Sequence, residues 1–345
     1  MMDKCEMVET VIVGAGISGL CMAIKLLMSG RTSFIILEKS AEIGGVWSSN
    51  RYPGCACDMP SHLYSFSFHR DPSAWSSLYA TRAEIHSYLT DCARSRGVLP
   101  HVRFHTEALS ATWDDCAAIW RIRAAHHRDD HDHDDDDHGF FEIHARFLVR
   151  AIGPWHMPKF PEKTIVPGID LFVGPSFHSS AWDPSIDLRD RVVAVVGTGA
   201  SAIQIVPEVA HIARKLYICQ RTPAWVLPKL EARIPPAVQC LLRRFPTLLC
   251  GLLWWTFLFV VELYLWALLG GPRRRRMGAM LAKWHLYRSI RDPTLRAALL
   301  PTYEFGNFSC RRFLTSSTFY PTLSRPNVEL LPGIVLSWFQ TLTGQ

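Results

Sequence analysis

Two short glycine-rich sequences contain the residues whose types and spacing suit the binding of a dinucleotide. In the first, Gly14, Gly16 and Gly19 have the G-x-G-x-x-G spacing. These glycines allow a tight turn, a close approach of a pyrophosphate to backbone N–H groups, and close packing of the following helix. Glu38 stands about 20 residues further on, where an acid is expected to bind a ribose hydroxyl. A fortuitous glycine turn is the alternative, but an acid at this spacing favours a dinucleotide site.

The second glycine-rich sequence has alanine at the position of the third glycine, a replacement that dinucleotide-binding turns allow. Ala202 takes that position, after Gly197, Thr198, Gly199, Ala200 and Ser201. The strand that follows ends in Arg221 and Thr222 rather than in an acid. Because a guanidinium suits a 2′-phosphate, the second site is predicted to prefer NADP to NAD.

Each glycine-rich sequence lies between a predicted strand and a predicted helix. Residues 10–13 form a β-branched run and residues 34–37 an apolar run, on either side of the first helix. Residues 191–196 and 215–219 flank the second helix, which is predicted at residues 203–212. Strands that alternate with helices in this way indicate βαβ units. The predicted fold class is therefore α/β, with two nested dinucleotide-binding (Rossmann-like) domains and a helical insertion.

Further helices and strands are predicted between the two glycine-rich folds. An amphipathic helix is expected at residues 81–96, with strands at residues 102–107 and 118–123 forming a small antiparallel layer. Another strand is expected at residues 147–152. Residues 126–138 are rich in His and Asp. These are metal-ligand types, but such a low-complexity charged segment between strands is more often a solvated loop, so no metal site is predicted.

The composition of the chain changes at residues 235–300, which are predicted to form the helical insertion. Residues 248–269 are almost wholly apolar, with Glu262 inside, and four arginines follow at 273–276. That length could span a bilayer, but an acid inside a span is costly and both nucleotide sites should share one compartment. A buried or membrane-surface helix is therefore predicted in preference to a span.

Composition limits the classes of protein to consider. The chain has 345 residues, 48% of them hydrophobic and 20% charged, which fits an ordinary globular protein. The net charge of +6 is concentrated in residues 273–276, and no basic and aromatic interleaving suggests a nucleic-acid partner. Ten cysteines without a Cys-x-x-Cys pair are read as mostly reduced. The short charged start at residues 1–9 predicts a cytoplasmic protein, with membrane association through residues 248–269 kept open.

Two irregular segments are predicted to be functional loops. Residues 44–64 contain glycines and X-Pro steps that prevent a long helix, and such loops commonly carry function. Asp58 lies in this segment. An Asp beside proline is commonly a turn or cap residue, and only a cation from elsewhere in the chain would give it a catalytic role. Residues 172–183 are predicted to be a structured connector between the two nucleotide sites.

The connector resembles that of the Baeyer–Villiger monooxygenases, a branch of the flavin-containing monooxygenases. Its motif positions are Phe172, Gly174, His178, Trp182 and Asp183. The Trp-Asp ending distinguishes this branch from N-hydroxylating relatives. The resemblance also includes GGVW at 44–47, RYPGCACD at 51–58, QRTPAWVLPK at 220–229, CRR at 310–312 and RPNVELL at 325–331. It extends over nearly the whole chain to Leu331, and the helical part is similar to that of fungal and bacterial members that oxidise ketones.

This resemblance implies two cofactors, FAD and NADPH, and assigns residues to each. FAD would lie on the first glycine turn, with Glu38 on its adenosine ribose, and Ala108 is also placed at this cofactor. The isoalloxazine side would be surrounded by Val46, Trp47, Asp58 and Tyr64. NADPH would lie on residues 197–201, and its 2′-phosphate would be held by Arg221 and Thr222, with Arg311 beside them.

The implied reaction uses O2 and NADPH to insert one oxygen atom into a ketone, giving an ester or lactone in secondary metabolism. The family places an arginine where this chain has Arg312, paired with an acid at Asp58. An always-cationic guanidinium can stabilise negative charge on the oxygen being transferred, which supplies the cation that Asp58 lacked. A truncated inactive remnant and an N- or S-oxygenating flavin monooxygenase are the alternatives.

The resemblance also predicts the domain boundaries. Residues 1–153 would be the first part of the FAD-binding domain, and residues 154–300 the NADP-binding domain with the helical insertion at 235–300. Residues 301–345 would return to the FAD domain, which is expected to be truncated because no third nucleotide-type signal follows Leu331.

Overall fold

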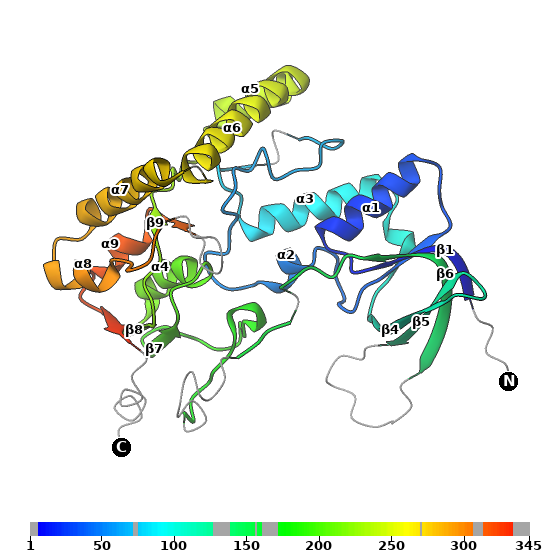
Figure 1. Cartoon of the computed structure of the whole chain (residues 1–345), viewed down its shortest axis with the longest axis horizontal. Coiled ribbons are helices and arrows are strands. Elements are labelled where there is room, and N and C mark those ends of the chain that lie inside the picture. Colours follow the sequence, from blue (N-terminus) through cyan, green and yellow to red (C-terminus); the bar gives the residue numbers. More distant parts are fainter. Residues whose placement is uncertain are drawn as a thin grey trace. The chain divides into compact units, whose positions relative to one another are not determined.

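The computed structural model describes residues 6–71, 75–126, 139–155, 157–160, 172–269, 271–305 and 313–333. The chain forms two compact units, drawn in Figure 1, one comprising residues 1–50 and 82–158 and the other residues 51–81 and 159–345. The second unit thus groups residues 51–81 and the end of the chain with the second glycine-rich sequence. The functional domain boundaries given above stay a prediction.

The first unit is built on one six-stranded sheet with the strand order β3-β2-β1-β6-β5-β4. The strands β3, β2, β1 and β6 are parallel neighbours, whereas β6, β5 and β4 pair antiparallel. The strand bounds are Glu6–Val13 (β1), Phe34–Leu37 (β2), Val102–Arg103 (β3), Thr106–Asp114 (β4), Ile119–His126 (β5) and Phe140–Arg150 (β6).

Two expectations about this sheet are corrected. The antiparallel strands do not form a separate layer, because β6 pairs with β1 on one side and with β5 on the other. The single strand predicted at 102–107 is divided between β3 and β4. His105 lies there with a φ of 50°, a left-handed conformation that interrupts an extended strand.

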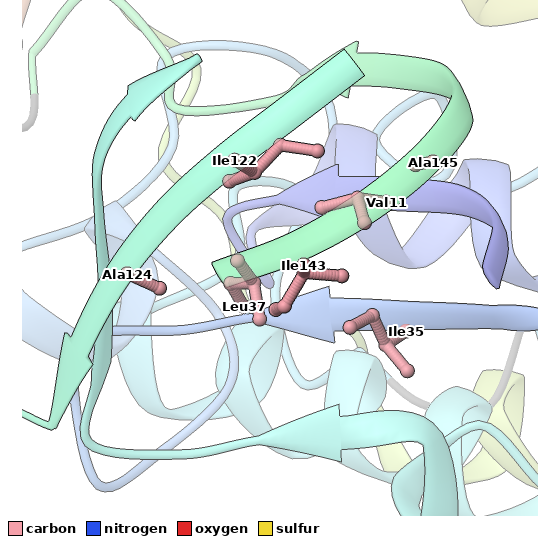
Figure 2. Packing of buried hydrophobic residues seen from close by; sticks show 7 residues of the cluster. All are labelled: Val11, Ile35, Leu37, Ile122, Ala124, Ile143 and Ala145. Carbon is pink, nitrogen blue, oxygen red and sulfur yellow. The ribbon is translucent and has the colours of Figure 1, made fainter. Parts of the chain in front are cut away.

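The core of the first unit runs through both the parallel and the antiparallel parts of the sheet. Figure 2 shows its side chains, which come from β1, β2, β5 and β6: Val11, Ile35, Leu37, Ile122, Ala124, Ile143 and Ala145. Ile122 and Ile143 stand directly opposite each other in the β5–β6 ladder, and both are fully buried. Such cross-strand contacts between β-branched residues stabilise neighbouring strands.

Helices α1 (Ile17–Met28), α2 (Val46–Ser49) and α3 (Arg82–Ser95) complete the first unit, with a 3₁₀ turn η1 at Leu99–His101. The predicted apolar face of α3 is confirmed, since Ile85, Tyr88, Leu89 and Cys92 are all buried. The elements β1, α1 and β2 follow one another with the glycine turn between β1 and α1, so the predicted Rossmann-type order is present.

The second unit contains a second parallel sheet with the order β11-β8-β7. Its elements are β7 (Val192–Val196), α4 (Ala202–Ile212), β8 (Lys215–Gln220) and β11 (Val328–Pro332), which confirms the second strand–turn–helix–strand pattern. A separate parallel pair joins β9 (Val226–Leu227) to β10 (Leu314–Thr315), and the short elements are η3 (Ser179–Ala181) and α9 (Phe319–Leu323).

The helical insertion of the second unit consists of α5 (Pro236–Arg244), α6 (Pro246–Leu269), α7 (Pro272–Ser289) and α8 (Pro293–Leu299). The four arginines at 273–276 belong to the first turns of α7 rather than to a flanking loop. Of the helices in the described ranges, none has the combination of length and apolar character that crossing a membrane requires. One face of α6 packs within the unit, because Phe257 stacks on His62 and Trp254 lies under the Arg70 guanidinium.

Candidate functional site

The first glycine turn is packed so tightly at Gly14 and Gly19 that no side chain fits at either position. Gly14 has a φ of +100°, and a Cβ at Gly19 would lie 1.9 Å from the carbonyl oxygen of Gly14. Gly45 approaches the same turn, since its Cβ would lie 3.0 Å from Gly16 Cα. A glycine turn of this kind before a helix is the arrangement that lets a pyrophosphate approach backbone N–H groups.

Glu38 lies against the first glycine turn, directly after β2. Its side chain is buried, and Oε2 accepts a hydrogen bond of 2.7 Å from the Ala15 N–H while Oε1 accepts one of 2.9 Å from the Ser40 N–H. A buried carboxylate is tolerated because both oxygens receive hydrogen bonds. The tertiary structure thus places Glu38, the residue predicted to bind the ribose, at the glycine turn. Its hydrogen bonds also order the backbone there.

The remaining predicted FAD residues divide between the two units. Val46 and Trp47 begin α2 beside the first glycine turn, because Gly44 N–H donates a hydrogen bond of 2.9 Å to the Ala15 carbonyl. Ala108 lies in β4 opposite Ala124, next to a β-bulge. Bulges are common beside active sites. Asp58 and Tyr64 belong to the second unit.

The second glycine turn connects β7 to α4 and is more open than the first. Gly197 has a φ of +106°, and its N–H donates a hydrogen bond of 2.8 Å to the Cys219 carbonyl at the end of β8. Thr198 Oγ1 lies 3.4 Å from the Thr222 carbonyl, which brings these two predicted ligands together. Arg221 follows β8 and is exposed.

The segment that carries Asp58 is held by residues that the sequence did not single out. Gln204 on α4 hydrogen-bonds to both Tyr52 and Ala56. Lys229 is buried, and its Nζ donates a hydrogen bond of 3.3 Å to the Cys57 carbonyl and lies 4.4 Å from the centre of the Tyr79 ring. The available signals were a glutamine near the start of the second predicted helix and the lysine that ends the QRTPAWVLPK motif.

Lys229 and the residues around it form a desolvated polar cluster. Burial lowers the pKa of the Lys229 ammonium, whereas the nearby Glu231, Cys57 and Asp58 raise it. Burial also raises the pKa of the Cys57 thiol to about 12, so Cys57 remains protonated at neutral pH. Lys229 thus lies in the same cluster as Asp58, which is itself exposed to solvent.

Arg311 and Arg312 lie outside the described residues, but the segment directly after them is firmly anchored. The Phe313 ring stacks with Phe305 at 5.8 Å, and both belong to an apolar cluster with Trp225. The Leu314 N–H donates a hydrogen bond of 2.7 Å to the Trp225 carbonyl as β10 pairs with β9. The strand that follows Arg312 therefore pairs with β9, which ends two residues before Lys229.

The connector residues form local contacts in an irregular segment, as predicted. His178 caps η3 by accepting a hydrogen bond from the Ser180 N–H, and the Phe177 and Trp182 rings meet edge to face at 4.9 Å. A Cβ at Gly174 would collide with the Phe172 ring. Asp183 caps a turn through Ser185, whose hydrogen bonds lower the pKa of the carboxyl.

The chain matches the family model described as "Flavin-binding monooxygenase-like" over residues 8–262. It is 39% identical to a Baeyer–Villiger monooxygenase of Streptomyces coelicolor, over 94% of this chain and 59% of that protein. The chain therefore spans about three fifths of that relative's length.

Solved structures show the same likeness. An open crystal structure of cyclohexanone monooxygenase matches with a TM-score of 0.79 and 25% identity, covering 94% of this chain and 67% of that one. The complex of OTEMO with FAD and NADP matches with a TM-score of 0.75 and 26% identity, covering 94% of this chain and 65% of that one.

Proposed function

Since this chain belongs to the flavin-binding monooxygenase-like family, we propose that it acts as an FAD- and NADPH-dependent monooxygenase that inserts one atom of O2 into a ketone. The observation that carries this proposal is the presence of two separate glycine turns, each between a parallel strand and a helix. The Baeyer–Villiger name of the Streptomyces coelicolor relative supports the reaction class. A ketone of secondary metabolism is the proposed substrate class.

The two turns fit the two cofactors in different ways. FAD would be held at the first turn, where a Cβ on Gly19 would fill the cradle and where Glu38 reaches the backbone of Ala15. NADPH would be held at the second turn, with Thr198 and Ser201 near its phosphates and Arg221 on the 2′-phosphate. When bound, the flavin supplies the redox chemistry that activates O2.

The side chains of this protein would have to stabilise charge during oxygen transfer. We assign that task to Arg312, whose guanidinium remains cationic at every working pH, and we assign Asp58 to orient it. Lys229 holds the backbone of the Asp58 segment at the Cys57 carbonyl.

The test of the proposed function begins with the absorption spectrum and flavin content of the purified chain. A flavoprotein is expected to be yellow, with FAD near equimolar to protein, and to oxidise NADPH with formation of an ester from a panel of ketones. A truncated inactive remnant would form no ester and show no ketone-dependent NADPH oxidation. An N- or S-oxygenating enzyme would consume NADPH with amines or sulfides but not with ketones, and either result would overturn the proposal.

Replacement of Arg221 by alanine should weaken the use of NADPH while leaving the use of NADH unchanged. A hydrogen bond to a charged group contributes about 1.5 to 3 kcal/mol, so we expect KM for NADPH to rise roughly 10- to 150-fold. Initial rates of cofactor oxidation at varied NADPH and NADH check this. Arg214→Ala is the matched control, because Arg214 is exposed at the opposite end of β8. Equal losses with both cofactors would contradict the 2′-phosphate assignment.

We also propose that a surface formed by α6 and α7 contacts an anionic membrane. On α6, Leu252, Trp255 and Phe259 follow each other at helical spacing and are 61%, 66% and 69% exposed. On α7, Met277, Met280 and Trp284 are also exposed. Residues 236–291 contain nine Arg or Lys residues and one acid, Glu262. Exposed apolar side chains with basic neighbours suit the surface of an anionic bilayer.

Vesicle sedimentation tests this contact. We expect the chain to sediment with vesicles of phosphatidylcholine and phosphatidylserine, less so at high salt, and only weakly with phosphatidylcholine alone. Trp255→Asp with Phe259→Asp should abolish binding, whereas Trp155→Asp, an exposed tryptophan of the first unit, should not. Concentration-dependent self-association without vesicle binding would instead assign this surface to a second copy of the chain.

A further inference from the structure

The segment from Tyr52 to Asp58 is fastened to α4 by the side chain of Gln204. Gln204 Oε1 accepts a hydrogen bond of 3.1 Å from the Tyr52 hydroxyl and lies 3.4 Å from the Ala56 N–H. Gln204 Nε2 donates a hydrogen bond of 3.0 Å to the Ala56 carbonyl. One side-chain amide thus pairs with both backbone groups of Ala56, two residues before Asp58.

The same segment lies directly on the backbone of α4. Gly54 has a φ of +76°, and a Cβ there would lie 2.6 Å from the carbonyl oxygen of Gln204. Ala56 also forms a β-bridge with Thr81, and the Cys57 N–H donates a hydrogen bond to the Ala80 carbonyl. The segment is therefore fixed from both sides, and a change at the start of α4 must be accommodated by it.

Gln204 lies within one helical turn of the second glycine-rich sequence. Gln204 N–H donates a hydrogen bond of 3.0 Å to the Ser201 carbonyl, and the Tyr52 hydroxyl makes a hydrogen bond with the Ser201 side chain. Ser201 is one of the proposed NADPH ligands. A dinucleotide at residues 197–201 would therefore meet a residue that already contacts the Asp58 segment.

We propose that Gln204 is a positioning residue that couples dinucleotide binding at residues 197–201 to the placement of Asp58. This inference rests on the proposed function, because it takes residues 197–201 as the NADPH site. Ligand binding that orders Ser201 lowers the entropic cost of ordering the segment attached to it, and the coupling acts equally in both directions. Asp58 would thus be placed most firmly when the dinucleotide is present.

Hydrogen exchange of residues 52–58, with FAD saturating and with or without NADP+, tests the coupling directly. In the wild type we expect NADP+ to slow amide exchange in this segment by at least about fivefold, the lower end of usual coupling strengths. In Gln204→Leu, where the hydrogen bond between Tyr52 and Ser201 remains, most of this NADP+-dependent slowing should be lost, and the Kd for NADP+ should rise by the corresponding factor.

Two further variants separate a positioning residue from a general structural one. Gln239→Leu is the matched control, because Gln239 also donates from a helix to a loop carbonyl, at Trp75, without contacting the Tyr52–Asp58 segment. It should leave NADP+-dependent protection intact. Gln204→Glu keeps the acceptor for Tyr52 but loses the donor to Ala56, so partial protection is expected.

The possible failures are distinguishable. If wild-type protein binds NADP+ but residues 52–58 show no change in exchange, or if Gln204→Leu retains full NADP+-dependent protection, the coupling is overturned while the proposed function stands. If wild-type protein binds no NADP+ by equilibrium titration, the NADPH assignment falls, and the coupling falls with it. If Gln204→Leu does not fold, the wild-type comparison still tests the coupling, and Gln204→Glu still tests the role of the side chain.

Discussion

Replacing Arg312 by alanine should lower the rate of ester formation by about 100- to 1,000-fold, the loss typical of a preorganised group that stabilises transition-state charge. The reason is that the proposed transfer develops negative charge on oxygen in a site from which water is excluded, and no neutral side chain replaces a guanidinium there. Arg312→Lys should recover only part of the rate, because an ammonium provides charge without the planar fork of donors.

The measurement for Arg312 compares ester formation with flavin content and with the rate of flavin reduction by NADPH. These two quantities should stay near wild type, since the proposed charge stabilisation concerns oxygen transfer alone. Arg291→Ala, which removes an exposed arginine after α7, should leave all three unchanged. Full retention of ester formation in Arg312→Ala would reject the assignment of this arginine.

Replacing Gly19 by alanine should destabilise the first unit and abolish FAD binding. The added Cβ would lie 1.9 Å from the Gly14 carbonyl oxygen and 3.5 Å from the Ala151 Cβ. Because the first of these neighbours is backbone rather than a flexible side chain, the turn itself must move. Overpacking of this kind costs about 1 to 3 kcal/mol and occasionally more, and we expect a value of at least about 3 kcal/mol.

Gly199→Ala provides the matched comparison in the second glycine turn. A Cβ at Gly199 meets no heavy atom within 4 Å, so the free energy of unfolding should change by less than about 0.5 kcal/mol. Urea unfolding and titration with FAD measure both effects. An equal loss of stability in the two variants would show that close packing is not what requires glycine at position 19.

The local sequence was sufficient for the elements of the two nucleotide folds. Residues 34–37 are predicted and observed as a strand with the same bounds, because a short apolar run that is rich in aromatic and β-branched residues favours a buried strand. The apolar face of α3 was likewise readable from helical spacing. The glycine turns followed because their spacing reflects steric needs within a few residues.

Strand pairing could not be predicted in the same way. The period of apolar residues indicates a strand but not its neighbour, so the antiparallel strands were placed in a layer of their own. In the structure β6 pairs with β1 through residues more than a hundred positions apart, such as Val11 and Leu148. The turn at His105 was also missed, because its positive φ at a non-glycine residue has no strong sequence signature.

By itself, the sequence determined the fold class, the two glycine turns and the acid at Glu38, all of which depend on contacts between near neighbours or on a repeated spacing. Only the tertiary structure decided how the Asp58 segment is held. Gln204 reaches Ala56 across 148 positions of sequence, and Lys229 reaches Cys57 across 172. The physical reason is that a buried backbone group must find a hydrogen-bond partner wherever the folded chain supplies one, and the spacing of residues does not encode that partner.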